Sequence, residues 1–438
     1  MALLDEAQAR ELLTRVIAMS RAEVTSASVS GGDQGNIRYA RNTVSTAGEE
    51  SNQSLNVSAS FGSRSGSSST NEFTPESITA CVRRAEELAR LAPEDPEYMS
   101  PLGPQSYRAT PAWSDRTAAI TPEDRARVAA ASILPAKAAK CVAAGFLSDG
   151  ARYTAQLNSL GRFGYHRSTS SNFSVTMRTD DERGSGYGVD NATDFAELDA
   201  ARASERAIAK AVASRSARAI EPGKYTVILE PPASQEILGF LWGAFNARSA
   251  DEGRSFLAKK GGGNRLGEKL FGEEVTIRSD PWDPRVPGSP WGADGIPQEA
   301  TTWIENGVVK NLNNSRYWAE KHGGRATPGM ANVIMSGGQG TVDDLIRTTE
   351  RGILVTRFWY IRSVDQQTVL VTGLTRDGTF YVENGKIQHA VKNFRFNESP
   401  VIMLNNIDAL AAPVRVGNAM IPPMRVRDFT FTSLSDAV

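Results

Sequence analysis

The chain has 438 residues, 40% of them hydrophobic and 23% charged, so it is long enough for two or three domains with cores of their own. Its formal net charge of −1 excludes a strongly basic surface for nucleic acid or for an anionic membrane. No apolar run approaches the roughly 18–20 residues that span a bilayer. The start, MALLDEAQARELL, lacks the regions of a signal peptide. We therefore expect no nucleic-acid partner and no membrane partner.

Residues 1–92 are predicted to form an N-terminal α+β domain. An amphipathic helix over 5–19 begins with Asp, a residue that caps helix N-termini. A second helix, over 74–91, begins with Thr followed by Pro. Between the helices, residues 22–62 alternate short β-prone runs with turns. The serine-rich piece Ser63–Thr70 is expected to be a flexible loop or hairpin tip.

Residues 93–120 are expected to be a linker, because five prolines between positions 93 and 111 resist regular structure. Residues 121–220 are then predicted to form a central α+β domain. Its first helix begins at Thr121, is interrupted at Pro135 and continues to about Ala144. The strand-like runs and the second helix of this domain lie at 152–158, 162–167, 172–177 and 196–217.

The two cysteines, Cys81 and Cys141, lie in segments that read as helical. Cys81 shares an apolar face with its helical neighbours, which favours a buried free thiol over a disulfide. Buried free thiols are typical of reducing compartments. We therefore expect the protein in the cytoplasm.

Residues 221–438 are predicted to form a β-rich, antiparallel C-terminal domain, which makes the fold class of the whole chain α+β. The clearest β pattern lies in a meander with runs at Ile353–Ile361, Thr368–Thr372 and Thr379–Val382. Residues 372–378 are expected to form a glycine-containing turn. Residues 383–385, Glu-Asn-Gly, carry the signature of a two-residue hairpin loop.

This meander and the segment after it resemble the TldD/PmbA (TldD/TldE) family, in which a phrase like TGxTRDGTFxxENGxI precedes a segment like vkNxRF. The phrase PGKYTVILEP at 222–231 is also typical of that family, and the resemblance is dense from residue 221 onward and looser before it. The matching residues in the meander are Thr372, Gly373, Thr375, Arg376, Asp377, Gly378, Thr379, Phe380, Glu383, Asn384, Gly385, Asn393, Arg395 and Phe396.

Catalytic members of this family carry the zinc motif HExxxH on a helix after the PGKYTVIL-type strand, with a cysteine far downstream. Here the corresponding segment, 233–245, is expected to be a helix. The motif positions fall near Gly239, Phe240 and Ala244, none of which can bind zinc or act as a base. No cysteine follows Cys141. The resemblance therefore implies that this chain binds no cofactor and that zinc is bound by a partner subunit.

The three histidines, His166, His322 and His389, are isolated in the sequence and form no recognisable metal motif. Distant residues can converge in a fold, so a divergent peptidase using His322 or His389 is kept as an alternative. Chelator-sensitive activity of the pure protein would support it.

Several meander residues are candidates for contact with a substrate or a partner. Arg376 could hold a peptide carboxylate or carbonyl, or anchor a partner subunit by a bidentate contact. Its neighbour Asp377 could simply pair with it in a structural role, and Arg357 and Tyr360 carry the same ambiguity. The full set of candidates is Arg357, Tyr360, Thr372, Thr375, Arg376 and Asp377.

The resemblance is to the TldE/PmbA type of subunit. It implies a heterodimer with a TldD-type zinc subunit that cleaves unfolded or short peptides, as in leader-peptide removal or antitoxin turnover. An exposed strand edge in the meander could pair with such a peptide through main-chain hydrogen bonds. The alternative from another class is a homodimeric peptide-binding protein with a vestigial cleft, and a homodimer of the isolated chain is also considered.

Overall fold

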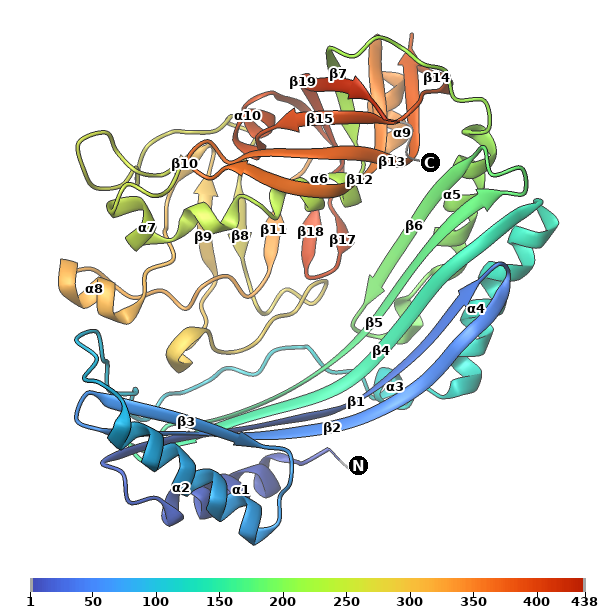
Figure 1. Ribbon diagram of the computed structural model, residues 1–438. Coiled ribbons are helices and arrows are strands. Elements are labelled where there is room, and N and C mark those ends of the chain that lie inside the picture. The colour runs from blue at the N-terminus through green and yellow to red at the C-terminus, as the bar shows by residue number, and fades with distance from the viewer. Residues whose placement is uncertain (1–2, 436–438) are drawn as a thin grey trace.

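The computed structural model describes residues 3–435 and has two layers, a long curved sheet and a β-rich domain above it (Figure 1). No helix in this range is long and apolar enough to cross a membrane. The elements of the first layer are α1 (Glu6–Met19), β1 (Val24–Ala40), β2 (Thr43–Phe61), β3 (Arg64–Thr70), α2 (Pro75–Leu91), α3 (Asp115–Ala118), α4 (Pro122–Ala138), β4 (Cys141–Asn158), β5 (Phe163–Thr179), β6 (Ser185–Ala192) and α5 (Ala200–Ala213).

The first layer is a single six-stranded antiparallel sheet in the order β3-β2-β1-β4-β5-β6. Ser26–Tyr39 of β1 pair with Gly145–Asn158 of β4, so the strands of 1–92 and of 121–220 lie in one sheet. The starts of α1, α2 and α4 are those that the sequence predicts, whereas the helix predicted over 196–217 is shorter and spans Ala200–Ala213. Asp5 and Thr121 each form a capping box, and Thr74 caps α2 with Pro75 in the first turn.

All four long helices of this layer cover the same face of the sheet. Ala27 and Val29 of β1 belong to the core under α1 and α2 at one end, and Ile37 and Tyr39 belong to the core under α4 and α5 at the other. Because side chains alternate along a strand, the even-numbered residues point to the opposite face. These are polar on the central strands and include Ser26, Ser28, Ser30, Gln34 and Asn36 of β1 and Thr154 and Gln156 of β4.

Three local predictions for this layer are wrong. Ser63–Thr70 is not a loop, because Arg64–Thr70 form β3, and Gly66 lets that strand pack directly on the backbone of α2. The helix that begins after Thr121 is not interrupted at Pro135 and ends at Ala138. Cys141 therefore begins a strand, although its thiol and that of Cys81 are buried and free.

The second layer contains β7 (Lys224–Leu229), α6 (Pro231–Leu238), α7 (Ala247–Asp251), β8 (Ile277–Ser279), β9 (Thr301–Glu305), β10 (Val308–Val309), α8 (Arg316–His322), β11 (Val333–Met335), α9 (Val342–Arg347), β12 (Arg351–Asp365), β13 (Leu370–Glu383), β14 (Lys386–Ala390), β15 (Phe394–Glu398), α10 (Pro400–Asn405), β16 (Ile407–Leu410), β17 (Val414–Val416), β18 (Ala419–Ile421) and β19 (Met424–Leu434). Short 3-10 turns lie at Phe195–Glu197, Trp242–Phe245 and Ala293–Gly295.

In this layer β12, β7, β19, β15 and β13 follow one another by hydrogen bonding, and β12 also pairs with β13. The strands thus close into a small barrel, which is filled by aromatic side chains from Phe358, Phe394, Phe396, Phe429 and Phe431. The predicted α+β class is confirmed. The sheets of this layer are mixed rather than purely antiparallel, because β7 runs parallel to β12 and β11 runs parallel to β18.

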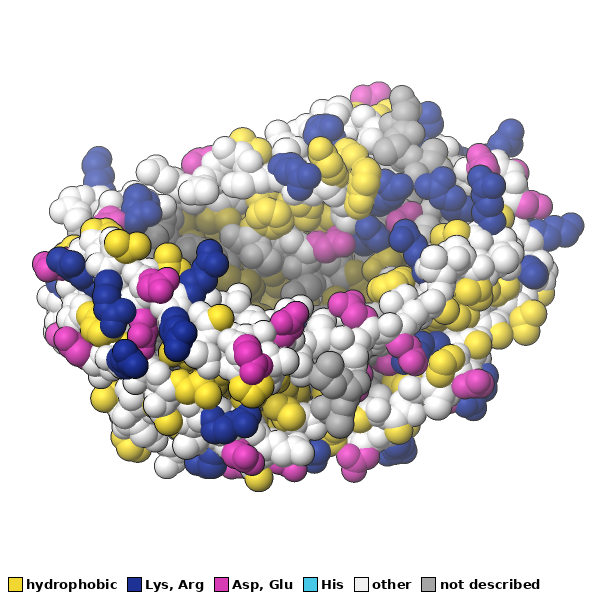
Figure 2. Space-filling model, turned by 60° about the horizontal axis from the view of Figure 1, so that its bottom comes forward, with side chains coloured by type: hydrophobic (Ala, Val, Ile, Leu, Met, Phe, Trp, Pro, Cys, Tyr) yellow, Lys and Arg dark blue, Asp and Glu magenta, His cyan; other side chains and the backbone are white. Residues whose placement is uncertain are grey.

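The two layers touch at several places and leave a hollow between them (Figure 2). At one end β6 and α5 contact β13. In the middle, the loop that carries Trp291 stands on the polar face of the sheet, where Trp291 packs against Tyr107 and His166. Beside this contact lies a cavity of about 420 Å³ lined by Ser30, Gln34, Asn52, Arg152, Thr154 and His166, among others.

Candidate functional site

The segment after β7 does not form the single helix expected over 233–245. Helix α6 ends at Leu238 with Gly239 as its C-cap, and a separate 3-10 turn follows at Trp242–Phe245. Gly239 is exposed, Phe240 is half-buried and Ala244 is buried in the core. These three positions therefore do not share one helical face.

None of these three side chains carries a nitrogen, oxygen or sulfur atom, so the site does not fit a zinc ion. Within residues 3–435 no three His, Cys, Asp or Glu side chains gather closely enough to hold a metal. The three histidines lie apart from one another. His166 faces the hollow, the ring centroid of His322 lies 4.3 Å from that of Trp318, and the ring centroid of His389 lies 5.3 Å from that of Tyr381. Burial lowers the pKa of His166 to about 4.

The phrase at 372–378 is not a turn but part of the long strand β13. Pairing with β12 passes from Val355↔Thr379 to Arg357↔Arg376, so Asp377 and Gly378 together lie opposite the single residue Thr356 and form a β-bulge. Asp377 has φ 56° and Gly378 has φ 117°. A Cβ on Gly378 would lie 2.8 Å from the Thr356 hydroxyl, so only glycine fits there. The Asn384-Gly385 hairpin loop between β13 and β14 is confirmed.

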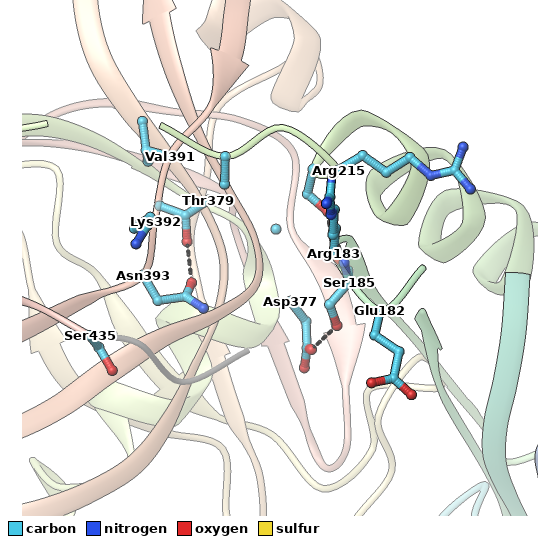
Figure 3. Close-up of a pocket in the computed structure, with 13 residues that line it drawn as sticks. Glu182, Arg183, Ser185, Arg215, Asp377, Thr379, Val391, Lys392, Asn393 and Ser435 are labelled. Atoms are coloured by element: carbon cyan, nitrogen blue, oxygen red, sulfur yellow. Dashed lines mark hydrogen bonds between the residues drawn. The ribbon is translucent and has the colours of Figure 1, made fainter. Parts of the chain in front are cut away.

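The bulge directs the Asp377 side chain toward β6 of the other layer, where the Ser185 hydroxyl donates a hydrogen bond to it (Figure 3). Asp377 is 2% exposed, and the guanidinium groups of Arg357 and Arg376 each lie 3.8 Å from its Oδ2. Arg357 stacks on Tyr187 of β6 at 4.2 Å, and its neighbour Arg376 stacks on Trp359 at 4.0 Å. The bulge therefore joins the barrel to the sheet through a charged, largely dehydrated contact.

Glu236, on α6, lies beside this contact. Its Oε2 accepts a hydrogen bond of 2.7 Å from the backbone N–H of Phe358. Burial raises the pKa of Glu236 from 4.5 to about 7, while the charge of Arg357 and the Phe358 hydrogen bond oppose part of that rise. Burial also raises the pKa of Tyr187. Carboxyl groups perturbed in this way are concentrated at functional sites. We name the group of Tyr187, Glu236, Arg357, Arg376 and Asp377 the bulge cluster.

The remaining candidates from the sequence lie outside the bulge cluster. Tyr360 is 57% exposed at φ 56°, in a second irregularity of β12, with Arg362 stacked on its ring at 4.3 Å. Thr372 donates to the Phe396 carbonyl within the barrel. Thr375 is 1% exposed; its hydroxyl accepts from the Phe394 N–H and bonds Asn393, so it holds the barrel together rather than facing a ligand.

A cavity of about 320 Å³ opens beside the bulge, between the two layers (Figure 3). Its lining includes side chains of both charges: Glu182 and Arg183 come from the β5–β6 turn, and Arg215 comes from the segment after α5. Thr379 and Asn393, which are hydrogen-bonded to each other at 3.1 Å, form the barrel side. This junction is the place where the two layers meet around charged groups.

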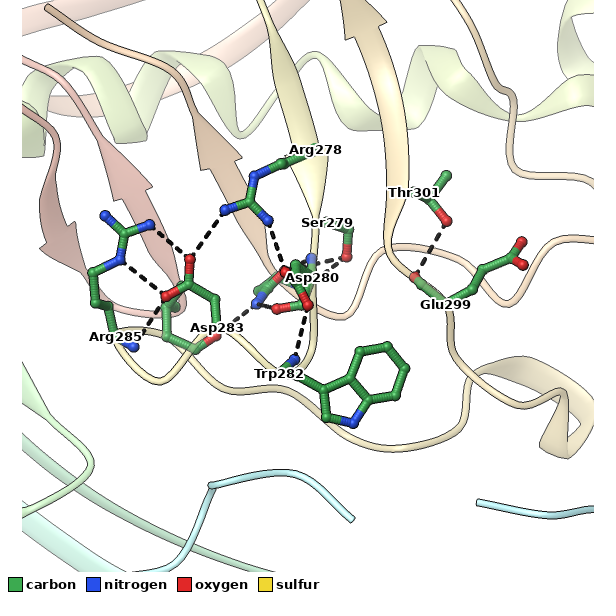
Figure 4. A network of polar contacts seen from close by, with 10 residues as sticks. Arg278, Ser279, Asp280, Trp282, Asp283, Arg285, Glu299 and Thr301 are labelled. Carbon is green, nitrogen blue, oxygen red and sulfur yellow. Dashed lines mark hydrogen bonds and ion pairs between the residues drawn. The ribbon is translucent and has the colours of Figure 1, made fainter. Parts of the chain in front are cut away.

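A network of polar contacts supports the loop that stands on the sheet (Figure 4). Asp283 accepts from Arg278 and Arg285, and Arg278 also donates to Asp280 at 2.9 Å. The amide of Asn332 accepts from the Asp280 N–H and donates to the Asp280 and Val286 carbonyls. With these groups paired, the loop 280–297 is held in one shape over the hollow.

Sequence reasoning thus found Arg357, Arg376 and Asp377 and missed Glu236 and Tyr187. Tyr187 had a usable signal. The alternating glycines 184, 186 and 188 let β6 pack on the backbone of α5, so the residues between them must face the other way, toward the barrel. Glu236 had no such signal, because nothing local indicates that its helix lies beside Phe358.

Models of the PmbA/TldA metallopeptidase domains match most of the chain: domain 1 matches residues 26–89, the central domain matches 115–215 and the C-terminal domain matches 222–433. The chain belongs to the PmbA/TldD metallopeptidase family. Among curated relatives, this family member is 23% identical to metalloprotease PmbA of Escherichia coli O157:H7 over 88% of the chain and 89% of that protein.

A metalloprotease of Methanothermobacter thermautotrophicus is 27% identical, over 48% of this chain and 47% of its own length, so that match spans about half of each protein. Among solved structures, TldE from Thermococcus kodakarensis superimposes with a TM-score of 0.87 at 18% identity and covers 97% of this chain and 99% of that one. At that identity the likeness shows the fold.

Proposed function

We propose that this chain is the subunit without a metal of its own in a heterodimeric zinc metallopeptidase, and that a TldD-type partner holds the zinc. The observation that carries the proposal is the chemistry at Gly239, Phe240 and Ala244, which offers no donor atom on a segment that is not one helix. A metallopeptidase needs a bound metal to activate water. A member of the family with this segment must then take the metal from another chain.

The peptide is proposed to bind along the outer edge of β12. Strand β7 covers that edge only at Ile353–Val355. Beyond Val355, the edge N–H of Phe358 is capped by the Glu236 carboxylate instead of by a strand. An extended peptide that adds to the edge would replace Glu236 as the acceptor. Recognition through the main chain favours unfolded or short peptides over particular sequences, which suits a role in leader-peptide removal or antitoxin turnover in the cytoplasm.

The test uses three preparations: this chain, its TldD-type partner, and the two expressed together. Elemental analysis is expected to find zinc with the partner and in the complex, at about one ion per pair, and none with this chain alone. Cleavage of an unfolded peptide by the partner is expected to rise when this chain is added. Stoichiometric zinc in this chain, or an unchanged cleavage rate, would refute the proposal.

A pair of variants at Glu236 tests the peptide edge. Glu236→Ala leaves the Phe358 N–H without its acceptor, so a peptide carbonyl no longer competes with the carboxylate. We expect a lower KM for the complex with this variant. Glu236→Gln keeps an acceptor oxygen at the same place and is expected to give a KM close to that of the wild type. If both variants match the wild type, the peptide does not bind at this edge.

A further inference from the structure

A pocket lies in the middle of the polar face of the six-stranded sheet. It is the cavity of about 420 Å³ next to Trp291, and we name it the sheet pocket. Its side chains come from two adjacent rows that run across β1, β4 and β5. The first row contains Gly32, Arg152 and Ser168, and the second contains Ser30, Thr154 and His166. Because neighbouring strands lie about 4.8 Å apart and alternate residues of one strand lie about 7 Å apart, these side chains converge on one small space.

Arg152 is the only arginine or lysine that lines the sheet pocket, and none of the described lining residues is acidic. One N–H of its guanidinium group donates a hydrogen bond of 3.0 Å to Gln34 Oε1 on β1. Gly32 leaves room for this arrangement, since a Cβ there would lie 2.8 Å from Arg152 Cγ. No other hydrogen bond or ion pair joins the guanidinium group to residues 3–435. The side chain is therefore held by one N–H, and the rest of its donor fork remains for a ligand.

Four other side chains of the sheet pocket have no hydrogen-bond partner in the part of the chain that the structure describes. They are the hydroxyl groups of Ser30, Thr154 and Ser168 and the ring of His166. Burial lowers the pKa of His166 to about 4, so its ring is neutral near pH 7 and offers one donor and one acceptor. Three hydroxyl donors and one neutral imidazole thus lie beside the guanidinium group.

The wall above the sheet pocket is preformed. The ring centroid of Trp291 lies 6.1 Å from that of His166 and 5.1 Å from that of Tyr107. The Tyr107 hydroxyl donates to the Gly295 carbonyl at 2.7 Å and accepts from Gln156 Nε2 at 3.4 Å. These contacts hold the loop, the segment around residue 107 and the sheet together, so a ligand does not have to order them.

The groups of the sheet pocket suit a ligand with a single negative charge. One guanidinium group balances one charge, and its planar fork matches the two oxygens of a carboxylate. A phosphate monoester, with a charge of about −1.5 to −2 near pH 7, would exceed the charge of Arg152. The last residue of a peptide presents a carboxylate and an amide N–H close together. The carboxylate can accept from Arg152 and the hydroxyl groups, and the N–H can donate to the acceptor nitrogen of His166.

We propose that the sheet pocket binds the C-terminal carboxylate of a peptide through Arg152, with His166 and the pocket hydroxyl groups as hydrogen-bond partners. This role deepens the proposed function and rests on it only in taking a peptide as the ligand. The sheet pocket is a second contact of the peptide with this chain, on the sheet instead of on the barrel. Binding there requires neither zinc nor a partner subunit.

The experiment measures the binding of labelled peptides to the full chain alone by fluorescence anisotropy. The probes are an unfolded peptide without acidic residues in two forms, one with a free C-terminal carboxylate and one with a C-terminal amide. We expect the wild type to bind the free acid with a dissociation constant about ten-fold lower than that of the amide. Arg152→Gln should bind both forms equally, because it lacks the charge that distinguishes them. The matched control Arg38→Gln removes an exposed arginine on the same face of β1, outside the sheet pocket, and should keep the ten-fold preference.

Both variants change exposed side chains, so thermal unfolding should show that each keeps the wild-type fold. Equal binding of the acid and the amide by the wild type, or no measurable binding of the acid, overturns the proposal. So does a preference that survives in Arg152→Gln or that falls equally in Arg38→Gln, since either result would place the contact elsewhere.

A third probe separates the peptide terminus from an acidic side chain. It is the amide form with glutamate as its last residue, and it should bind as weakly as the plain amide. Binding as tight as that of the free acid would overturn the assignment to the C-terminus. The outcome is independent of the zinc measurement: zinc in this chain alone would refute the proposed function and leave the preference for the free acid intact.

Discussion

Replacement of Glu236 by Gln is expected to stabilise the protein in alkaline solution and to have little effect in acid. The unfolded side chain ionises near its ordinary pKa of 4.5, whereas in the folded protein burial raises that pKa to about 7. As the pH rises from 4.5 through 7, the unfolded state loses a proton that the folded state still holds. The stability contributed by the neutral carboxyl group is therefore complete below pH 4.5 and is lost as the pH passes 7.

The magnitude follows from the size of the shift. Each unit of pKa corresponds to about 1.4 kcal/mol, so the rise from 4.5 to about 7 amounts to roughly 3 kcal/mol of stability lost across this range. Glutamine has nearly the same shape, carries no charge, and keeps an oxygen that can accept from the Phe358 N–H. Glu236→Gln should thus unfold with a free energy higher by up to roughly 3 kcal/mol near pH 8 and about equal to the wild type near pH 4.5.

Urea unfolding followed by tryptophan fluorescence at both pH values measures this difference. Another buried acid, Glu398, also has a pKa raised by burial, but it is present in both proteins and cancels in the comparison. Glu320→Gln, at an exposed position on α8, is the matched control and should change stability equally at both pH values. The reasoning is refuted if Glu236→Gln is less stable than the wild type near pH 8, or if its effect does not depend on pH.

Three further changes test the packing. Asp377→Ala leaves two arginines without their shared carboxylate and should cost about 3 kcal/mol in urea unfolding, whereas an effect below about 1 kcal/mol would contradict the ionic role of the bulge. Gly378→Ala puts a Cβ 2.8 Å from the Thr356 hydroxyl at φ 117° and should lower the free energy of unfolding by about 1–3 kcal/mol. The control Gly243→Ala, where nothing lies near the added Cβ, should lower it by less than about 1 kcal/mol. Equal effects of the two variants would contradict the steric argument. Arg125→Met leaves the Asp149 carboxylate buried without its partner and should lower the free energy of unfolding by about 3–5 kcal/mol. The double variant Arg125→Met/Asp149→Leu should recover most of that loss. A double variant no more stable than the single one would show that packing rather than charge is lost.

The signals in the sequence that proved correct are local ones. A helix cap is a contact between residues a few positions apart, so Asp5, Thr74 and Thr121 could be read directly as helix starts. The hairpin at Asn384-Gly385 depends on two residues that tolerate positive φ.

What failed depends on which partner a segment meets. A glycine with positive φ is compatible with both a turn and a bulge. Asp377-Gly378 form a bulge because β13 pairs with β12 on both sides of these two residues. Ser63–Thr70 reads as a loop until α2 packs on its glycine. The sequence therefore determined the family and the fold class. Only the tertiary structure could place Glu236 beside Phe358 and join the strands of 1–92 and 121–220 into one sheet, because burial and strand pairing arise between residues far apart in the chain.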